Sequence, residues 1–350
     1  MKKKAIFFLP GGTGGAERVS VTISKFLPRE KYEIKFVIVD RNKGTIERFI
    51  PEDIDVSFLK IRNIWDFVSF RIYALLKKEK PDFVFVSIFH LSPRVLVAAK
   101  LCGIKAIVRS SNMLKDGLPY YKKLMLKYTY PWAYKVIAQQ EEMRVELLNE
   151  FSLDPQRVLA LQNPLDVNSI NAKIRVPSPF RDVNQDKFVW VARIAYQKGQ
   201  DVLVKAFEIV KRKNPHAHLY LIGAYSEEDQ FYQNIQQYIK DSKIEGFVHF
   251  MGFDENPYRW MYNCDCFVLP SRWEGLPNAL IEATYLGKPA VSTRCLPIIK
   301  RIINEGINGY TCERENPQDM ANAMEKALKM TVVKQPYYSA SPEDFVNLFE

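Results

Sequence analysis

Segments of strand length and helix length alternate from one end of the chain to the other, and this order constrains the fold more than any other feature. Apolar runs with the length of buried strands recur in the first half at 5–9, 34–39, 56–59, 83–88, 106–108 and 136–138. Amphipathic segments of helical length lie between them, for example 16–26, 65–78 and 93–102. Further strands are expected in the second half at 188–191, 219–222, 248–251, 266–269 and 290–292. This order predicts an α/β fold with doubly wound parallel sheets and ligands at the carboxyl ends of the strands.

A chain of 350 residues exceeds the size of one compact core and predicts two domains. Between residues 163 and 185, three prolines occur among Asn, Ser and Asp with little periodicity. We therefore expect a first domain over 1–165, a linker over 166–186 and a second domain over 187–335. A helix-start signature at 341–344 predicts a last helix within 336–350.

Basic residues are concentrated in the first half of the chain. Residues 1–175 hold 30 Lys and Arg against 18 Asp and Glu, a balance of +12, whereas residues 176–350 hold 20 against 22, a balance of −2. The excess predicts an anionic partner for the first half. Nucleic acid and the anionic face of a membrane are both candidates, and charge alone does not separate them.

The five cysteines show neither a zinc-binding spacing nor a secreted disulfide framework, so reduced thiols in the cytosol are expected. The apolar run after the first lysines is too short for a signal peptide and is interpreted as a strand. No run approaches the roughly 18 apolar residues of a membrane-spanning helix. A cytoplasmic protein, soluble or bound to a surface, is therefore expected.

Residues 271–289 hold two carboxylates around a predicted helix start. Glu274 lies in the turn after an apolar strand, and Glu282 lies inside the amphipathic helix that follows. The free backbone N–H groups of a helix start attract anions, above all phosphate. A diphosphate bound there would leave one carboxylate for a ribose diol and the other for a sugar hydroxyl. The alternative is a first-turn Glu that caps its own helix and a second Glu in solvent, which we favour for such a pair in isolation.

Two cations follow another predicted strand. Arg193 lies at the end of strand 188–191, and Lys198 lies at the start of the next helix. At the carboxyl edge of a sheet, these side chains and a helix N-terminus would bind a diphosphate. They would stabilise the charge of a nucleoside diphosphate leaving group. In isolation, the same spacing is more often a solvated surface.

Taken together and in this order, the two cations and the segment SRWEGLPNALIEATYLGKP resemble the nucleotide-sugar site of retaining GT-B glycosyltransferases, specifically glycosyltransferase family four (glycosyl transferases group 1). The resemblance is strongest over 187–311 and looser across the first domain. It implies two doubly wound, Rossmann-like domains that face each other across a cleft. The first would bind the acceptor, the second would bind the nucleotide sugar, and the last helix would return to the first domain.

The resemblance also implies a reaction. A hexose or N-acetylhexosamine would be moved with retention from a nucleotide sugar, expected to be a UDP-sugar, to a glycan acceptor in surface polysaccharide or glycoconjugate synthesis. Arg193, Lys198 and Glu274 are the expected catalytic residues. In the mechanism attributed to the family, the leaving diphosphate takes the acceptor proton, so no metal and no other cofactor is expected. The D-x-D sequence at 53–55 precedes a strand in a surface-like context.

Further donor contacts are expected from the resemblance at Gly275, Leu276, Asn278 and Glu282, at Gly14 and Gly15 in the glycine-rich loop after the first strand, and at Gly252 and Phe253, where the family reads the nucleobase. The glycine-rich loop matches neither a dinucleotide fingerprint nor a P-loop, and a plain tight turn is its alternative. Asp40 weakly resembles the ribose-binding acid of an NAD site. A core position is the alternative for Phe253.

Acceptor contacts are expected at His90, Arg109, Ser111 and Asn112, which follow strands of the first domain. Two departures from the family pattern affect this expectation. Many members have a His after the strand at 106–108, where this chain has the sequence RSSN. Members often have a Glu just before paired isoleucines, where this chain has Lys300 and Arg301.

Residues 118–135 interleave six aromatic side chains with four lysines, and the segment 64–80 is similar. Such a pattern suits an anionic membrane surface and also suits nucleic acid. The alternative is that the aromatic side chains lie in the core and the lysines are solvated. We expect peripheral binding to the inner membrane face, where a polyprenyl-diphosphate-linked glycan would present its terminal sugar. A nucleic-acid partner is not expected.

Two other classes of function stay open, because a fold does not fix a function. One is a non-catalytic nucleotide- or RNA-binding protein on a doubly wound scaffold. The other is a different GT-B enzyme, such as a phosphorylase or an epimerase.

Overall fold

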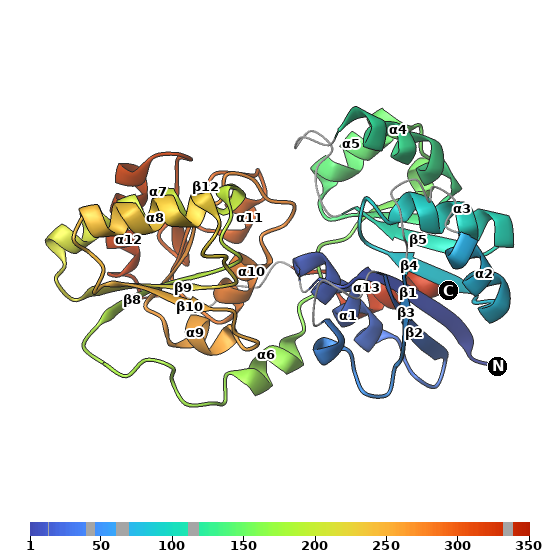
Figure 1. The fold of residues 1–350 in the computed structure, drawn as a ribbon, viewed down its shortest axis with the longest axis horizontal. Coiled ribbons are helices and arrows are strands. Elements are labelled where there is room, and N and C mark those ends of the chain that lie inside the picture. The colour runs from blue at the N-terminus through green and yellow to red at the C-terminus, as the bar shows by residue number, and fades with distance from the viewer. Residues whose placement is uncertain (13, 40–45, 61–69, 111–118, 332–338) are drawn as a thin grey trace. The chain divides into compact units, whose positions relative to one another are not determined.

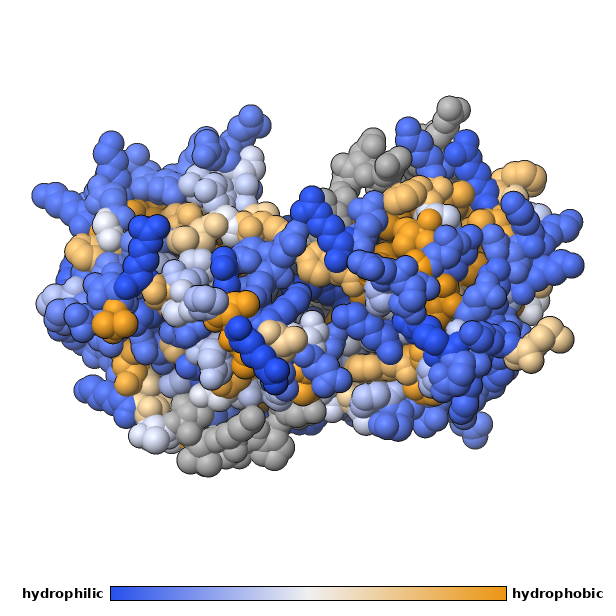
Figure 2. Space-filling view, turned by 90° about the horizontal axis from the view of Figure 1, so that it is seen from below, coloured by the Kyte–Doolittle hydropathy of each residue, from blue (hydrophilic) through white to orange (hydrophobic). Residues whose placement is uncertain are grey.

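The computed structural model describes residues 1–12, 14–39, 46–60, 70–110, 119–331 and 339–350 (Figure 1). The chain forms two compact units, Met1–Leu165 with Ser339–Glu350 and Asp166–Tyr338. Each unit is a parallel sheet with helices packed on it. Hydrophilic residues cover most of the face drawn in Figure 2, since much of the apolar sequence lies in the cores of the two units.

The first unit contains a seven-stranded parallel sheet in the order β3-β2-β1-β4-β5-β6-β7. Its strands are β1 (Lys3–Pro10), β2 (Tyr32–Val39), β3 (Asp55–Leu59), β4 (Phe83–Val86), β5 (Lys105–Arg109), β6 (Lys135–Ala138) and β7 (Val158–Ala160). Its helices are α1 (Gly15–Phe26), α2 (Phe70–Glu79), α3 (Ser92–Cys102), α4 (Tyr120–Thr129), α5 (Glu141–Phe151) and α13 (Pro342–Val346). The sequence analysis found each of these strands except the three-residue β7. Residues 65–69 of the helix expected at 65–78 lie outside the described part of the chain.

The second unit contains a six-stranded parallel sheet in the order β10-β9-β8-β11-β12-β13. Its strands are β8 (Asp186–Val191), β9 (Ala217–Ile222), β10 (Val248–Gly252), β11 (Cys266–Leu269), β12 (Ala290–Thr293) and β13 (Gly309–Cys312). Its helices are α6 (Val167–Lys173), α7 (Gln200–Lys213), α8 (Gln230–Asp241), α9 (Tyr258–Asn263), α10 (Asn278–Tyr285), α11 (Ile299–Ile302) and α12 (Pro317–Ala327). The strand order reverses between the adjacent strands β8 and β11, and such a switch point is where doubly wound sheets bind ligands.

The segment expected as a linker begins with a helix that belongs to the second unit. The side chain of Asp166 accepts a hydrogen bond from the backbone of Ser169 and so caps α6. Tyr285 donates to Asn171, and Asn256 donates to the carbonyl of Lys173, so α6 is bonded to the unit that follows it. These tertiary contacts hold a short helix that the sequence does not mark by apolar periodicity.

The last residues return to the first unit. Ser341 and Asp344 form a capping box at the start of α13. Phe349 is fully buried, and its ring centroid lies 5.7 Å from that of Phe7 and 5.6 Å from that of Phe83. Residues 339–350 therefore complete a core on one face of the first sheet, where α13 lies against α1 (Figure 1).

Two histidines on the adjacent strands β9 and β10 make the stability of the second unit depend on pH. The rings of His218 and His249 stack with centroids 5.3 Å apart, and their facing nitrogens are 3.0 Å apart. Burial lowers the pKa of His218, with further contributions from His249 and Lys211, and burial also lowers the pKa of His249. The unfolded chain, with a pKa near 6.5, therefore binds these protons more readily than the folded chain does. This contribution to stability is fully present above about pH 6.5 and is lost as the pH falls below that value.

We expect the unfolding temperature to fall between pH 7.5 and pH 5.5, by about 2–4 °C for each kcal/mol lost. His218→Gln should reduce this fall, because it removes one of the two coupled protonations. His216→Gln, at an exposed histidine of the same unit, is the matched control. Calorimetric scans of the three proteins across this range test the expectation, and identical slopes for all three would contradict it.

Candidate active site

A lysine and a glutamate meet at the switch point of the second sheet. Lys198 lies in a 3₁₀ turn, η4 (Tyr196–Lys198), after β8, and Glu274 lies in the loop between β11 and α10. The Lys198 Nζ atom is 2.7 Å from Oε1 and 2.9 Å from Oε2 of Glu274. The Lys198 side chain is 18% exposed and that of Glu274 is 7% exposed. The two residues stand 76 positions apart in the sequence, and the pairing of β8 with β11 brings them together.

The carboxylate of Glu274 has a second donor. Ser271 Oγ donates to Glu274 Oε1 at 2.6 Å, and Thr293 at the end of β12 donates to the carbonyl of Ser271 at 2.5 Å. A buried carboxylate is stable only when its charge is paired and hydrogen-bonded. Ser271 and Thr293 were not singled out in the sequence, although Ser271 stands only three positions before Glu274. Burial raises the pKa of the nearby Cys295 thiol to about 12, and Glu274 adds to the shift, so this thiol is protonated at neutral pH.

Glycines allow the loops at this edge to approach closely. Gly199 has a φ of +69°, and a Cβ atom there would lie 2.1 Å from the carbonyl oxygen of Pro270. Gly223, in the loop after β9, leaves no space for a side chain, because a Cβ atom would lie 1.5 Å from the carbonyl oxygen of Ala192. The loop after β8 is thus packed between its two neighbours, and Gly223 is a residue of this edge that the sequence analysis missed.

Arg193 lies at the same edge but in a different environment from Lys198. It is exposed, and its carbonyl oxygen accepts a hydrogen bond of 3.0 Å from Gln200 Nε2. Within the described part of the chain, the guanidinium of Arg193 has no ion-pair partner, whereas the ammonium of Lys198 is bonded to Glu274. Of Arg193 and Lys198, Arg193 is therefore the cation that is more accessible to an anion in solution.

The second carboxylate of the segment is held by a tyrosine. Glu282 is half-buried in α10, and Tyr258 of α9 donates to it over 3.2 Å. The residue at the start of α10, Pro277, provides no side-chain cap, and Glu274 bonds to Lys198 instead. The alternative interpretation, in which Glu274 caps its own helix and Glu282 lies in solvent, is therefore wrong. Gly275 and Leu276 are buried in the loop before α10, and Asn278 is half-buried at its first position.

The expected nucleobase contacts lie at the end of β10. Gly252 ends the strand with a φ of +71°, and its carbonyl accepts a hydrogen bond from the backbone of Gly223 at 2.8 Å. Phe253 is 48% exposed. The alternative of a core phenylalanine is therefore wrong. The exposed ring follows β10, which is separated from β8 at the switch point by β9.

Charged and polar side chains are also buried at the carboxyl edge of the first sheet. Gly14 precedes α1, and the Glu17 carboxylate folds back to within 2.7 Å of the place where a Gly14 Cβ atom would lie. Arg109, at the end of β5, donates to Asn163 and is 2% exposed. Burial lowers the pKa of Arg109 to about 9, although Glu17 opposes this, and burial raises the pKa of Glu17. Burial of such charged groups away from water is costly for folding.

Two of the other residues expected at this edge, Gly15 and His90, lie in the described part of the chain. Gly15 is the first residue of α1. His90 is exposed in the turn between β4 and α3. Ser111, Asn112 and Asp40 lie outside the described residues.

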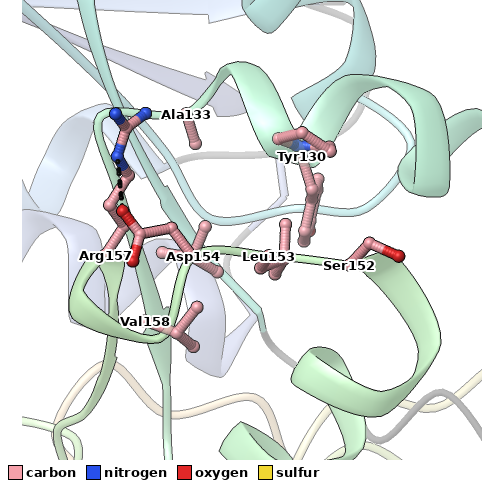
Figure 3. Close-up of a pocket in the computed structure, with 9 residues that line it drawn as sticks. Tyr130, Ala133, Ser152, Leu153, Asp154, Arg157 and Val158 are labelled. Carbon is pink, nitrogen blue, oxygen red and sulfur yellow. Dashed lines mark ion pairs between the residues drawn. The ribbon is translucent and has the colours of Figure 1, made fainter.

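Among the described residues, no group of three His, Cys, Asp or Glu side chains is arranged to hold a metal ion. The carboxylates of the D-x-D sequence form ion pairs, Asp53 with Arg29 at 2.6 Å and Asp55 with Lys35 at 2.9 Å. A pocket of about 250 Å³ in the first unit is shown in Figure 3. Val136, the second residue of β6, and Val158, the first residue of β7, line it. It lies at the amino ends of these strands, away from the edge that carries Arg109.

Comparison with known proteins agrees with the two-unit α/β fold. Residues 173–340 match the model of glycosyl transferases group 1, and residues 13–169 match the model of glycosyltransferase family 4. An N-acetylgalactosamine-N,N'-diacetylbacillosaminyl-diphospho-undecaprenol 4-alpha-N-acetylgalactosaminyltransferase of Campylobacter jejuni is 24% identical, over 96% of this chain and 93% of the relative. A UDP-Gal:alpha-D-GlcNAc-diphosphoundecaprenol alpha-1,3-galactosyltransferase of Escherichia coli is 23% identical, over 87% of this chain and 79% of the relative. The crystal structure of Anabaena Alr3699/HepE in complex with UDP and glucose superimposes with a TM-score of 0.79 and 18% identity, covering 93% of this chain and 92% of that one.

Two doubly wound α/β units define the GT-B fold, and the two family models identify the chain as a glycosyltransferase. Each family model covers just under half of the chain, the two together cover nearly all of it, and they support a glycosyltransferase of the family-four type, as its motifs predicted. It is a glycosyltransferase of polysaccharide or glycoconjugate synthesis.

Proposed function

We propose that this enzyme moves a hexose or N-acetylhexosamine from a UDP-sugar to a lipid-linked glycan, with retention of the anomeric configuration and without a metal ion. The observation that carries the proposal is the Lys198–Glu274 pair beside the start of α10. Lys198 and the exposed Arg193 supply positive charge where a departing diphosphate needs it. Glu274 and Glu282 supply oriented acceptor oxygens for hydroxyl groups of the sugar and the ribose.

The UDP-sugar donor is supported by two neighbours. The galactosyltransferase of Escherichia coli is named for a UDP-sugar donor, and Alr3699/HepE was crystallised with UDP and glucose. The exposed Phe253 offers a ring for stacking on a base. Gly14 and Gly15, at the start of α1, are proposed to approach the donor through backbone atoms.

We test the donor and the mechanism together. The purified enzyme is incubated with UDP-, GDP- and ADP-sugars and with short-chain prenyl-diphosphate glycans, in buffer that contains EDTA. We expect release of UDP that depends on the acceptor, and an α-linked product from an α-configured donor, read from the anomeric proton in NMR spectra. Release of GDP or ADP alone would contradict the proposed donor. A β-linked product would contradict retention, and loss of activity in EDTA would contradict metal independence.

A lipid-linked acceptor is supported by the names of the Campylobacter jejuni and Escherichia coli transferases, which describe diphosphoundecaprenol-linked glycans as acceptors. We infer that the acceptor sugar meets the carboxyl edge of the first unit, where Glu17, Arg109 and Asn163 place hydrogen-bonding groups in a desolvated environment. His90 stands at the same edge, after β4. Ser111 and Asn112, which follow β5 in the sequence, are proposed as further acceptor contacts.

The surface of α4 supports peripheral attachment to an anionic membrane. Tyr120 is 78% exposed, Tyr128 is 66% exposed, and Lys127 is exposed between them, whereas Tyr130 just after the helix is buried. Exposed aromatic and basic side chains on one helix suit the interface of an anionic bilayer. No helix in the described ranges has both the length and the apolar content that crossing a bilayer requires.

We expect the enzyme to co-sediment with vesicles of phosphatidylglycerol and phosphatidylcholine at low salt and to be released at high salt. Lys127→Ser should lower the partition coefficient about fivefold, since each lysine near such a surface contributes ~1 kcal/mol. Lys213→Ser on the second unit is the matched control and should have no effect. Absence of binding at low salt would exclude membrane attachment by α4.

A further inference from the structure

The side chain of Arg272 joins the two turns that carry Lys198 and Glu274. Arg272 stands between Ser271 and Glu274 in the sequence, yet its side chain is only 8% exposed. Nη1 donates to Asp201 Oδ1 at 3.0 Å and to the carbonyl of Tyr196 at 2.5 Å, and Nη2 donates to Asp201 Oδ2 at 2.7 Å. The guanidinium carbon lies 3.8 Å from the centroid of the Tyr196 ring. The guanidinium thus bonds to residues on both sides of Lys198, Tyr196 before it and Asp201 after it.

The backbones of the same two turns are also bonded. The Arg272 N–H donates to the carbonyl of Gln197 at 2.8 Å, and Gln197 Nε2 donates to the carbonyl of Trp273 at 3.0 Å. A third anchor comes from the segment before α12, because Arg272 Nη2 also donates to Glu315 at 3.1 Å. None of these bonds involves the atoms of Lys198 and Glu274 that form the ion pair.

The chemistry of lysine makes such anchoring useful. An ammonium group is a point charge on a flexible stem, and it has no planar geometry of its own to fix its direction. Its position against a diphosphate therefore depends on the backbone turn that carries it. In an enzyme, a misplacement of about 1 Å costs on the order of 10²-fold in rate.

We propose that Arg272 is a positioning residue, which holds the Tyr196–Lys198 turn against the Glu274 loop so that the Lys198 ammonium is oriented for the leaving diphosphate. This inference rests on the proposed function of the Lys198–Glu274 site and adds a residue to it. Arg272 acts through Lys198 and does not itself contact the substrate.

A double-mutant cycle separates positioning from general stabilisation. kcat/KM is measured with the sugar nucleotide that the wild-type enzyme uses, and UDP affinity is measured by calorimetry, for Arg272→Met, Lys198→Met and the double variant. We expect Arg272→Met to lower kcat/KM about 100-fold in the wild-type background. In the Lys198→Met background, we expect the same change to lower it less than threefold, because the group that Arg272 orients is already absent. UDP affinity should show the same non-additivity.

Three further variants complete the test. Arg272→Lys keeps a charge opposite Asp201 and should restore kcat/KM to within about tenfold of the wild type. Asp201→Asn removes the partner charge, and its effect should also depend on Lys198, which keeps the inference testable where Arg272→Met does not fold. Arg212→Met breaks a matched arginine–glutamate pair at the far end of α7 and should leave activity unchanged.

Equal effects of Arg272→Met in both backgrounds would overturn the inference, as would an Arg272→Lys variant no better than Arg272→Met. In either case an active wild-type enzyme would leave the proposed function intact. A wild-type chain that neither transfers sugar nor binds UDP would instead overturn the proposed function, and the role of Arg272 would be lost with it.

Discussion

Lys198→Met is expected to lower kcat by about 10²–10³-fold, the loss that follows removal of one preorganised group at a developing charge. The substitution keeps the stem of the side chain and removes the ammonium that lies 2.7 Å from Glu274 Oε1. The leaving diphosphate would then lose its buried cation, and the carboxylate of Glu274 would lose its counter-charge. Steady-state release of UDP, with kcat and KM determined separately, measures this effect.

Glu274→Gln tests the other half of the pair. Glutamine keeps the size of the side chain and an oxygen for the Ser271 hydroxyl, but it leaves the Lys198 ammonium without a counter-charge. A fall in kcat of similar size is expected. Lys213→Met is the matched control, since it removes a lysine–glutamate pair from the surface of the same unit, with Glu325. If Lys198→Met kept more than half of the wild-type kcat, the pair would have no part in the reaction.

Phe349→Ala is expected to destabilise the first unit by about 3–5 kcal/mol, the cost of deleting a buried phenylalanine ring. Phe349 is fully buried, and its ring also packs edge-on against Tyr32, with centroids 6.2 Å apart. Urea unfolding of the variant measures the loss. Hydrogen exchange locates it, because the amides of β1 should lose protection while those of β8 keep it.

Tyr120→Ala is the control for this prediction. Tyr120 is 78% exposed in the same unit, so its truncation should change stability by no more than about 0.5 kcal/mol. A loss below 1 kcal/mol for Phe349→Ala would show that residues 339–350 contribute little to the first core.

Most of the fold could be predicted because the central strands are continuous apolar runs. The runs at 5–9 and 266–269 are buried on both faces of their sheets, and such continuous apolar runs are typical of central parallel strands. β7 and β13 could not be found in this way. They are short strands at the edges of the sheets, and β13 (Gly309–Cys312) contains a glycine, a threonine and a half-buried tyrosine in place of an apolar run.

The candidate site was predictable as a set of residues but not as a set of contacts. Lys198 and Glu274 were identified from their motifs, whereas their direct pairing follows from the adjacency of β8 and β11, which the sequence does not reveal. The burial of Arg109 also could not be predicted from the sequence. A charged residue at a strand end is normally exposed, and its burial depends on Glu17 and Asn163, which are distant in the chain.

The return of residues 339–350 to the first unit has a consequence during synthesis. The ribosome must make all of Asp166–Tyr338 before the segment that covers Phe7 and Phe85 emerges. At elongation speeds of about 5–20 residues per second, the aromatic side chains of the first core stay uncovered for roughly 10–35 s. We expect the early chain to need protection from aggregation over that interval, whereas the later, contiguous unit can fold as soon as its own strands have emerged.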